Sequence, residues 1–270
     1  MIQLDTARCI GCGLCVQDCF PAALSLAQKK AQLSAPQNCI GCGHCIAICP
    51  RNAVSDDSLP MDDVQHIHTA VSSDALLDHM RSRRSCRHYR PDPIPDAVLN
   101  KLLQAARACP TAKNAQATRY ILVTKQIHTL LDSALDTLGE IGTLQYSTAK
   151  DPSELRRAEN FIHWAARRKT DKSFDPLFFH APMLLLFIAE AENIRDAASA
   201  ASYTELMAAA LGLGCLYSGY FTACAAGSRE IQKILGLVKT EQVVRCLVLG
   251  YPDIQFERTA PRKSPNVLFM

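Results

Sequence analysis

The order of apolar and polar positions separates a short cysteine-rich start from a longer part with helical and strand periodicity. From about Ser72 onward, several segments place apolar residues at helical spacing, and some begin with a serine, aspartate or proline. The segments expected to be helical are 72–83, 95–110, 126–138, 152–168, 195–213 and 228–235. Three apolar runs, 118–124, 183–191 and 243–251, are expected to be strands, the second of them buried. Helices interleaved with a few strands predict a central sheet covered by helices.

Composition narrows the class of protein without naming a function. The chain has 270 residues, 48% of them hydrophobic and 20% charged, which is typical of a folded globular protein. A formal charge of +3 is too small to indicate nucleic-acid binding. The longest apolar run, 183–189, is far shorter than the roughly 20 residues of a membrane span, and the N-terminus lacks a signal-peptide pattern. We therefore expect a cytoplasmic protein without a membrane or nucleic-acid partner.

Eight of the thirteen cysteines form two copies of the pattern C-x2-C-x2-C-x3-C, at 9–19 and 39–49. In a reducing compartment such thiols are metal ligands rather than disulfides. Three closely spaced thiolates ligate one iron cluster, and the fourth ligates the other cluster of the pair. The expected ligand sets are Cys9, Cys12, Cys15 and Cys49 for one 4Fe–4S cluster, and Cys39, Cys42, Cys45 and Cys19 for the second. Two zinc sites or a disulfide knot fit this spacing poorly, because paired zinc motifs are separated by a longer loop.

These motifs resemble the bacterial two-cluster ferredoxin domain over residues 1–55. The glycines at 11, 13, 41 and 43 are expected to permit the backbone angles of the ligand loops, and 24–35 to supply short strands and a turn. The polar, acidic stretch 56–72 is expected to be a linker, in which His66 and His68 are solvated rather than metal ligands. The five other cysteines, which lack ligand spacing, are expected to be small buried residues: Cys86, Cys109, Cys215, Cys224 and Cys246.

Three stretches of the longer part suggest more than packing. The basic segment 81–95 fits a solvated face or a nucleic-acid arm, but guanidinium groups beside a serine also suit a phosphate. Asn114, in a turn before a strand, offers both a donor and an acceptor to a heterocycle. In 210–221 the long helix ends in glycines and is expected to continue as a loop with exposed backbone N–H groups.

Together these stretches resemble the nitroreductase family of FMN flavoproteins over roughly residues 75–263. The resemblance implies an α+β fold in which the small ferredoxin-like domain (1–55) and linker (56–72) precede an FMN-binding domain (73–270) with a central, mostly antiparallel sheet. It also implies a homodimer, in which the irregular C-terminal tail extends to the partner. The residues that it assigns to FMN are Arg83, Arg84, Ser85 and Arg87 for the phosphate and ribityl chain, Asn114, Tyr217, Ser218 and Gly219 for the ring, and Arg262 or Lys263 for the phosphate. The chain departs from the family at Ala117 and Thr118, where Pro-Trp is common, and at Tyr217, where tryptophan is common.

The combination of cofactors predicts an oxidoreductase that passes electrons from the clusters to FMN and then to a small organic acceptor such as a nitroaromatic, quinone or enone. Its donor is an external ferredoxin or NAD(P)H, although no dinucleotide fingerprint follows a strand. An electron-transfer relay to a protein partner is the alternative, and a reaction in which the flavin is the substrate is a third. No proton donor is identified. The segment 151–179, with Trp164, His163, Arg167 and Arg168, is either a lid over the acceptor or an ordinary amphipathic helix with a basic face.

Overall fold

The computed structural model describes residues 1–68 and 71–270, and these form two compact units. The first consists of Met1–Ala70 and Pro110–Gln116, and the second of Val71–Cys109 and Ala117–Met270. The expected linker falls partly on residues 69 and 70, which lie outside the described residues. In the part that is described, a 3-10 turn, η2 (Met61–Asp63), follows the last strand of the first unit. Leu59 and Met61 pack against Ile2, Ile46 and Val54. The domain limits at residues 55 and 72 remain a prediction.

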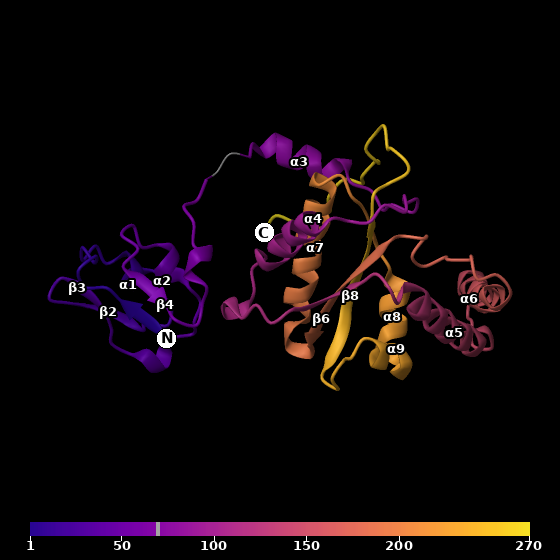
Figure 1. Cartoon of the computed structure of the whole chain (residues 1–270), viewed down its shortest axis with the longest axis horizontal. Coiled ribbons are helices and arrows are strands. Elements are labelled where there is room, and N and C mark those ends of the chain that lie inside the picture. Colours follow the sequence, from indigo (N-terminus) through magenta and orange to yellow (C-terminus); the bar gives the residue numbers. More distant parts are fainter. Residues whose placement is uncertain (69–70) are drawn as a thin grey trace. The chain divides into compact units, whose positions relative to one another are not determined.

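The first unit contains two small antiparallel sheets and two short helices (Figure 1). Strand β1 (Ile2–Leu4) pairs with β4 (Val54–Asp56), and β2 (Leu24–Ala27) pairs with β3 (Lys30–Leu33). The two helices, α1 (Leu14–Gln17) and α2 (His44–Ala47), each begin within a cysteine motif, and η1 (Pro36–Asn38) precedes the second motif. The prediction of two short strands and a turn for 24–35 is confirmed, with Gln28 and Lys29 at positive φ in the turn.

The second unit is built on a four-stranded antiparallel sheet in the order β5-β6-β8-β7. The strands are β5 (Arg119–Val123), β6 (Met183–Glu190), β7 (Gly214–Tyr217) and β8 (Glu241–Gly250). All three pairings are antiparallel, as the resemblance implied. Strand β6 is buried from Met183 to Ala189, because helices cover both faces of the sheet there (Figure 1).

Alternate residues of β6 contribute to two separate cores. Leu184, Leu186 and Ile188 pack against α5 (Ile127–Tyr146), α8 (Gly219–Gly227) and α9 (Arg229–Ile234). Leu185 and Phe187, on the other face, pack against α4 (Asp96–Arg107) and α7 (Ile194–Ala210). Each buried side chain of this size contributes about 1.5–3 kcal/mol through removal from water. The remaining elements are α6 (Pro152–Thr170), which packs on α5, α3 (Ser73–Ser82), η3 (Ala112–Asn114) and η4 (Ala191–Asn193).

Two expectations for this unit need correction. Helix α5 continues to Tyr146, past the expected end at Leu138, because its second half packs against α6. The stretch expected to be a loop after α7 instead forms strand β7 and then helix α8, since β7 pairs with β8 at the edge of the sheet. The five cysteines outside the motifs are all buried, as predicted. Among the described residues, no helix is long and apolar enough to cross a membrane.

Candidate functional site

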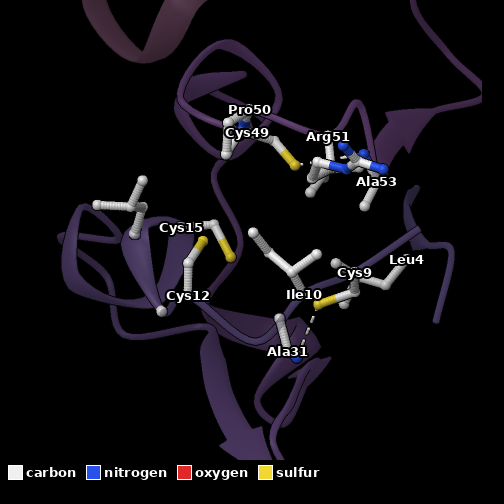
Figure 2. A pocket seen from close by; sticks show the side chains of 13 residues that line it. Leu4, Cys9, Ile10, Cys12, Cys15, Ala31, Cys49, Pro50, Arg51 and Ala53 are labelled. Atoms are coloured by element: carbon white, nitrogen blue, oxygen red, sulfur yellow. Dashed lines mark hydrogen bonds between the residues drawn. The ribbon is translucent and has the colours of Figure 1, made fainter. Parts of the chain in front are cut away.

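The first cysteine cavity lies in the first unit and combines residues from both motifs. Cys9, Cys12 and Cys15 line it together with Cys49, which belongs to the second motif. Figure 2 shows Cys49 reaching the cavity from a different stretch of chain than the other three cysteines. The space between the protein atoms, with the adjoining solvent, measures about 370 Å³. Four thiols around one cavity are the donor set of a 4Fe–4S cluster.

A second cavity repeats this arrangement with the roles of the two motifs exchanged. Cys39, Cys42 and Cys45 line it together with Cys19, and its space measures about 400 Å³. The structure therefore brings together the same two sets of four cysteines that the spacing predicted. No three His, Cys, Asp or Glu side chains of residues 1–68 and 71–270 are close enough to hold a single metal ion. The four cysteines of each cavity line a common space instead, and four thiolates around one space are the donor set of a polynuclear cluster.

The local geometry that creates these cavities is repeated as well. Gly13 and Gly43 have φ values of 77° and 76° directly before α1 and α2, a conformation that glycine adopts without strain. After each helix the last cysteine accepts a backbone hydrogen bond, from Ala23 N–H to the sulfur of Cys19 at 3.3 Å and from Ala53 N–H to that of Cys49 at 3.2 Å. Backbone donors aimed at sulfur stabilise a thiolate, which is the form that ligates metal.

Burial alone acts against thiolates in these cavities. Desolvation raises the pKa of Cys45 to about 11, with a smaller contribution from the neighbouring Cys42. By contrast, the N–H groups of Ala31 and Gly11 lower the pKa of Cys9 below its ordinary value. A positive charge beside Cys45 would favour its thiolate, and the iron ions of a cluster would supply such a charge. The donor chemistry of both cavities thus fits iron–sulfur clusters.

In the second unit, the basic segment 83–87 lies beside strand β7. Ser85 forms a parallel bridge with Cys215, and the N–H of Cys86 donates to the carbonyl of Cys215 at 2.9 Å. Ser85 itself is exposed, as are Arg84 and Arg87, and the guanidinium of Arg87 lies 5.9 Å from the ring centroid of Phe179. The basic segment and the strand that leads to 217–219 are therefore neighbours, although they are 130 residues apart in the sequence.

The stretch 217–219 differs from the exposed loop that was expected. Tyr217 is the last residue of β7, and Ser218 is buried between β7 and α8. The N–H of Ser218 donates to the carbonyl of Cys246 at 2.9 Å, and its hydroxyl donates to the carbonyl of Leu177 at 3.3 Å. The backbone N–H of Ser218 is therefore already used within the fold. Gly219 begins α8, where the N–H groups of the first turn have no partner within the helix.

The other residues assigned to the flavin belong to the first unit or to the C-terminal segment. Asn114 belongs to Pro110–Gln116 of the first unit and has a positive φ of 55°. Arg262 and Lys263 are exposed in the irregular C-terminal segment. Their assignment to the flavin remains a prediction.

The segment 151–179 contains some side chains that are buried in the fold and others that are exposed. Arg168 is buried, and its Nε donates to Oδ1 of Asp132 at 2.6 Å, which makes it part of the contact between α6 and α5. Arg167 is exposed and lies over the ring of Phe174, 4.3 Å from its centroid. Trp164 packs edge-on against Tyr220, whose position follows Gly219, at a centroid distance of 5.9 Å. Arg168 is therefore turned inward and does not belong to the basic outer face that was expected. The role of the rest of the segment stays a prediction.

One residue of the site was missed in the sequence. Glu205 of α7 accepts a hydrogen bond from Nη1 of Arg83 at 2.7 Å, and Tyr217 lies near the same carboxylate. Desolvation raises its pKa above the ordinary value, although Arg83 and Tyr217 act in the opposite direction. The only sequence signal was a carboxylate in the second half of an alanine-rich helix.

Comparison with known proteins identifies both parts of the chain. The model described as "Nitroreductase family" matches residues 80–251, well over half of the sequence. The chain belongs to the nitroreductase family. A model described as "4Fe-4S dicluster domain" matches residues 1–50, so this nitroreductase-family oxidoreductase carries an N-terminal ferredoxin-like domain.

Individual relatives of this nitroreductase-family chain are distant. A protein named "Putative NAD(P)H nitroreductase YfhC" from Bacillus subtilis is 24% identical and covers 72% of this chain and 91% of its own length. A nitroreductase with bound FMN from Bacteroides fragilis is 20% identical, covers 72% of this chain and 98% of its own, and superposes with a TM-score of 0.53. Iodotyrosine deiodinase bound to FMN and 3-iodo-L-tyrosine is 21% identical, with 72% and 98% coverage and a TM-score of 0.52. Structural likeness at this identity establishes the fold and leaves the substrate open.

Proposed function

We propose that this chain binds two 4Fe–4S clusters and one FMN, and that it reduces a small organic acceptor such as a nitroaromatic, quinone or enone. The observation that carries the proposal is the pair of cavities, each lined by three cysteines of one motif and the fourth cysteine of the other. Clusters accept electrons singly and FMN can release a pair, so together they convert a one-electron supply into a two-electron reduction.

The residues of the chain have separate tasks in this proposal. The thiolates of the two cysteine sets hold the clusters, and the backbone N–H groups of Ala23 and Ala53 stabilise the charge on sulfur. In the second unit, Arg83, Arg84, Ser85 and Arg87 offer guanidinium and hydroxyl donors that suit the FMN phosphate. The adjacency of Ser85 and Cys215 supports one continuous site, because β7 leads from there to Gly219 at the start of α8.

The cofactor content provides the first test. Protein purified without oxygen should contain about eight iron and eight sulfide per chain. It should also contain one FMN, with a flavin absorption band and an EPR signal from reduced clusters. A colourless preparation, or one with zinc and no flavin, contradicts the proposal. Rapid mixing of the reduced protein with nitroaromatics and quinones then tests the acceptor. If only protein acceptors reoxidise it, the chain is an electron-transfer relay instead.

We further infer that the chain acts as a homodimer. Phe256, Val267, Leu268 and Phe269 of the C-terminal segment are exposed, and so are Leu76, Leu77 and Met80 of α3. Apolar side chains on two surface segments of one unit are typical of a surface that associates. Light scattering should give twice the chain mass of 29.6 kDa. A variant in which Val267, Leu268 and Phe269 are replaced by serine should have a larger dimer dissociation constant than the wild type. An unchanged dissociation constant would show that the C-terminal segment does not contribute to the dimer.

A further inference from the structure

Glu205 lies beside a residue that the proposed function assigns to the flavin phosphate. Its Oε1 lies 2.7 Å from Nη1 of Arg83. Tyr217, the last residue of β7, lies near the same carboxylate and acts to lower its pKa. One carboxylate on α7 thus holds the segment that follows α3.

The surroundings of this carboxylate exclude a role as an ordinary surface charge. The side chain of Glu205 is 13% exposed, and that of Arg83 is 33% exposed. Neighbouring positions on α7 are small and buried, among them Ala201, Thr204 and Ala208. Burying a carboxylate is unfavourable unless a hydrogen bond or an opposite charge compensates, and here Arg83 provides both. The positions of the carboxylate and of the guanidinium are therefore linked.

Arg83 has further N–H donors that a second anion could use. A guanidinium group has five N–H donors, and Glu205 is bonded to Nη1 alone. Arg83 directly follows the last residue of α3, so its side chain would otherwise be free to adopt many rotamers. His79 reinforces the same contact, because its Nε2 lies 2.8 Å from the carbonyl of Leu206. A ligand that meets an oriented guanidinium loses less conformational entropy on binding.

We propose that Glu205 is a positioning residue that orients Arg83 toward the phosphate of the flavin. This proposal rests on the proposed function, since it requires that the second unit bind FMN. The carboxylate does not touch the flavin. It fixes the direction of the guanidinium donors, and Arg84 and Arg87 are exposed on the same segment.

The test compares flavins with and without a phosphate. Full-length protein, freed of flavin without oxygen, is titrated with FMN and with riboflavin, and binding is followed by flavin fluorescence. Glu205→Ala should weaken FMN binding about tenfold and riboflavin binding less than twofold, because only FMN presents the phosphate that Arg83 meets. Glu205→Gln retains an acceptor for Arg83 and should lose at most about threefold. Glu192→Ala, which removes an exposed carboxylate just before α7, is the matched control and should change neither affinity.

Each other outcome has a distinct meaning. If both Glu205 variants bind FMN more tightly, the carboxylate repels the phosphate and the proposal is overturned. If FMN and riboflavin lose affinity equally, Glu205 supports the fold in general and does not position Arg83. If the wild-type protein binds neither flavin, the proposed function itself fails, which is a different result from a variant that loses FMN alone.

Discussion

Gly11 lies directly against the carbonyl group of Lys29. A Cβ atom placed on Gly11 would come within 2.0 Å of that oxygen, and φ at Gly11 is +71°. In the second motif, Gly41 occupies the corresponding position with a φ of +66°, but a Cβ there meets nothing within 4 Å. The two motifs therefore share a backbone conformation and differ in the space around it.

This difference predicts unequal effects of the same substitution. Gly11→Ala and Gly41→Ala both introduce a side chain at positive φ, which costs about 1–2 kcal/mol. Only Gly11→Ala also forces the Cys9 loop away from the β2–β3 turn. We expect Gly11→Ala to lose about half of the iron, from the cavity of Cys9, and Gly41→Ala to keep nearly all of it. Iron and sulfide per chain, measured after anaerobic purification, check this. Equal losses would mean that strain at positive φ dominates and the contact with Lys29 does not matter.

Replacing one ligand of each cluster tests the proposed electron route. Cys12→Ala and Cys42→Ala should each abolish reduction of the flavin by a low-potential ferredoxin, because the chain of clusters is broken. If NAD(P)H delivers electrons directly to the flavin, turnover with NAD(P)H should persist in both variants. Rates with the two donors, measured at equal FMN content, distinguish these routes. Loss of both activities, with FMN retained, would contradict the route through the clusters.

How far the sequence predicts this structure depends on how local each feature is. The cysteine motifs were predictable because ligand spacing is set within eleven residues. Strand β6 was predictable from its unbroken apolar run. Strand β7 was missed because it has only four residues, and its existence depends on pairing with β8, for example Leu216 with Val248. Helix α8 is apolar on all sides and shows no periodicity in its sequence GYFTACAAG.

The site followed the same rule. Arg83 was assigned from its motif, yet its partner Glu205 is 122 positions away. No spacing rule reports such a pair, since it arises from the packing of α3 against α7. Likewise, the sequence of α6 suggested either a lid or an amphipathic helix with a basic face. Only the packing of α6 on α5 shows that Arg168 is turned inward.

Close packing between α5 and α6 predicts the effect of a small change at Gly142. A Cβ on Gly142 would lie 2.8 Å from the carbonyl oxygen of Ala158 and 2.9 Å from Cβ of Phe161. Alanine favours an isolated helix by about 1 kcal/mol over glycine, but overpacking two backbones costs about 1–3 kcal/mol. We therefore expect Gly142→Ala to lower the free energy of unfolding. Gly227→Ala, where a Cβ meets nothing within 4 Å, is the control and should be neutral or slightly stabilising. Chemical denaturation, followed by Trp164 fluorescence, measures both.

Replacing the buried Arg168 should lower the free energy of unfolding more than replacing its exposed neighbour Arg167. Arg168 donates to Asp132 and to the carbonyls of Lys172 and Phe174, while Arg167 is exposed. Arg168→Met removes all of these donors, so the two carbonyls lose this partner and Asp132 keeps its contact with Lys172 alone. We therefore expect the free energy of unfolding to fall by about 2–4 kcal/mol. Arg167→Met should change stability by less than about 0.5 kcal/mol. If the two variants lose the same free energy of unfolding, the buried contact of Arg168 with Asp132 contributes no special stability to α6.

Asp132 adds a pH dependence whose sign follows from the same contact. Burial acts to raise the pKa of Asp132, but hydrogen bonds from Arg168 and Lys172 outweigh it and hold the pKa below the ordinary 3.8. A carboxyl group with a lowered pKa stabilises the fold above its unfolded pKa, and that contribution disappears as the pH falls through the folded pKa. The stability advantage of the wild type over Asp132→Asn should therefore be full at pH values above about 5 and shrink below about 4. Unfolding followed by Trp164 fluorescence reports on α6 itself, even where acid removes iron from the first unit. An advantage that grows on acidification would mean that the carboxylate is destabilising where it lies.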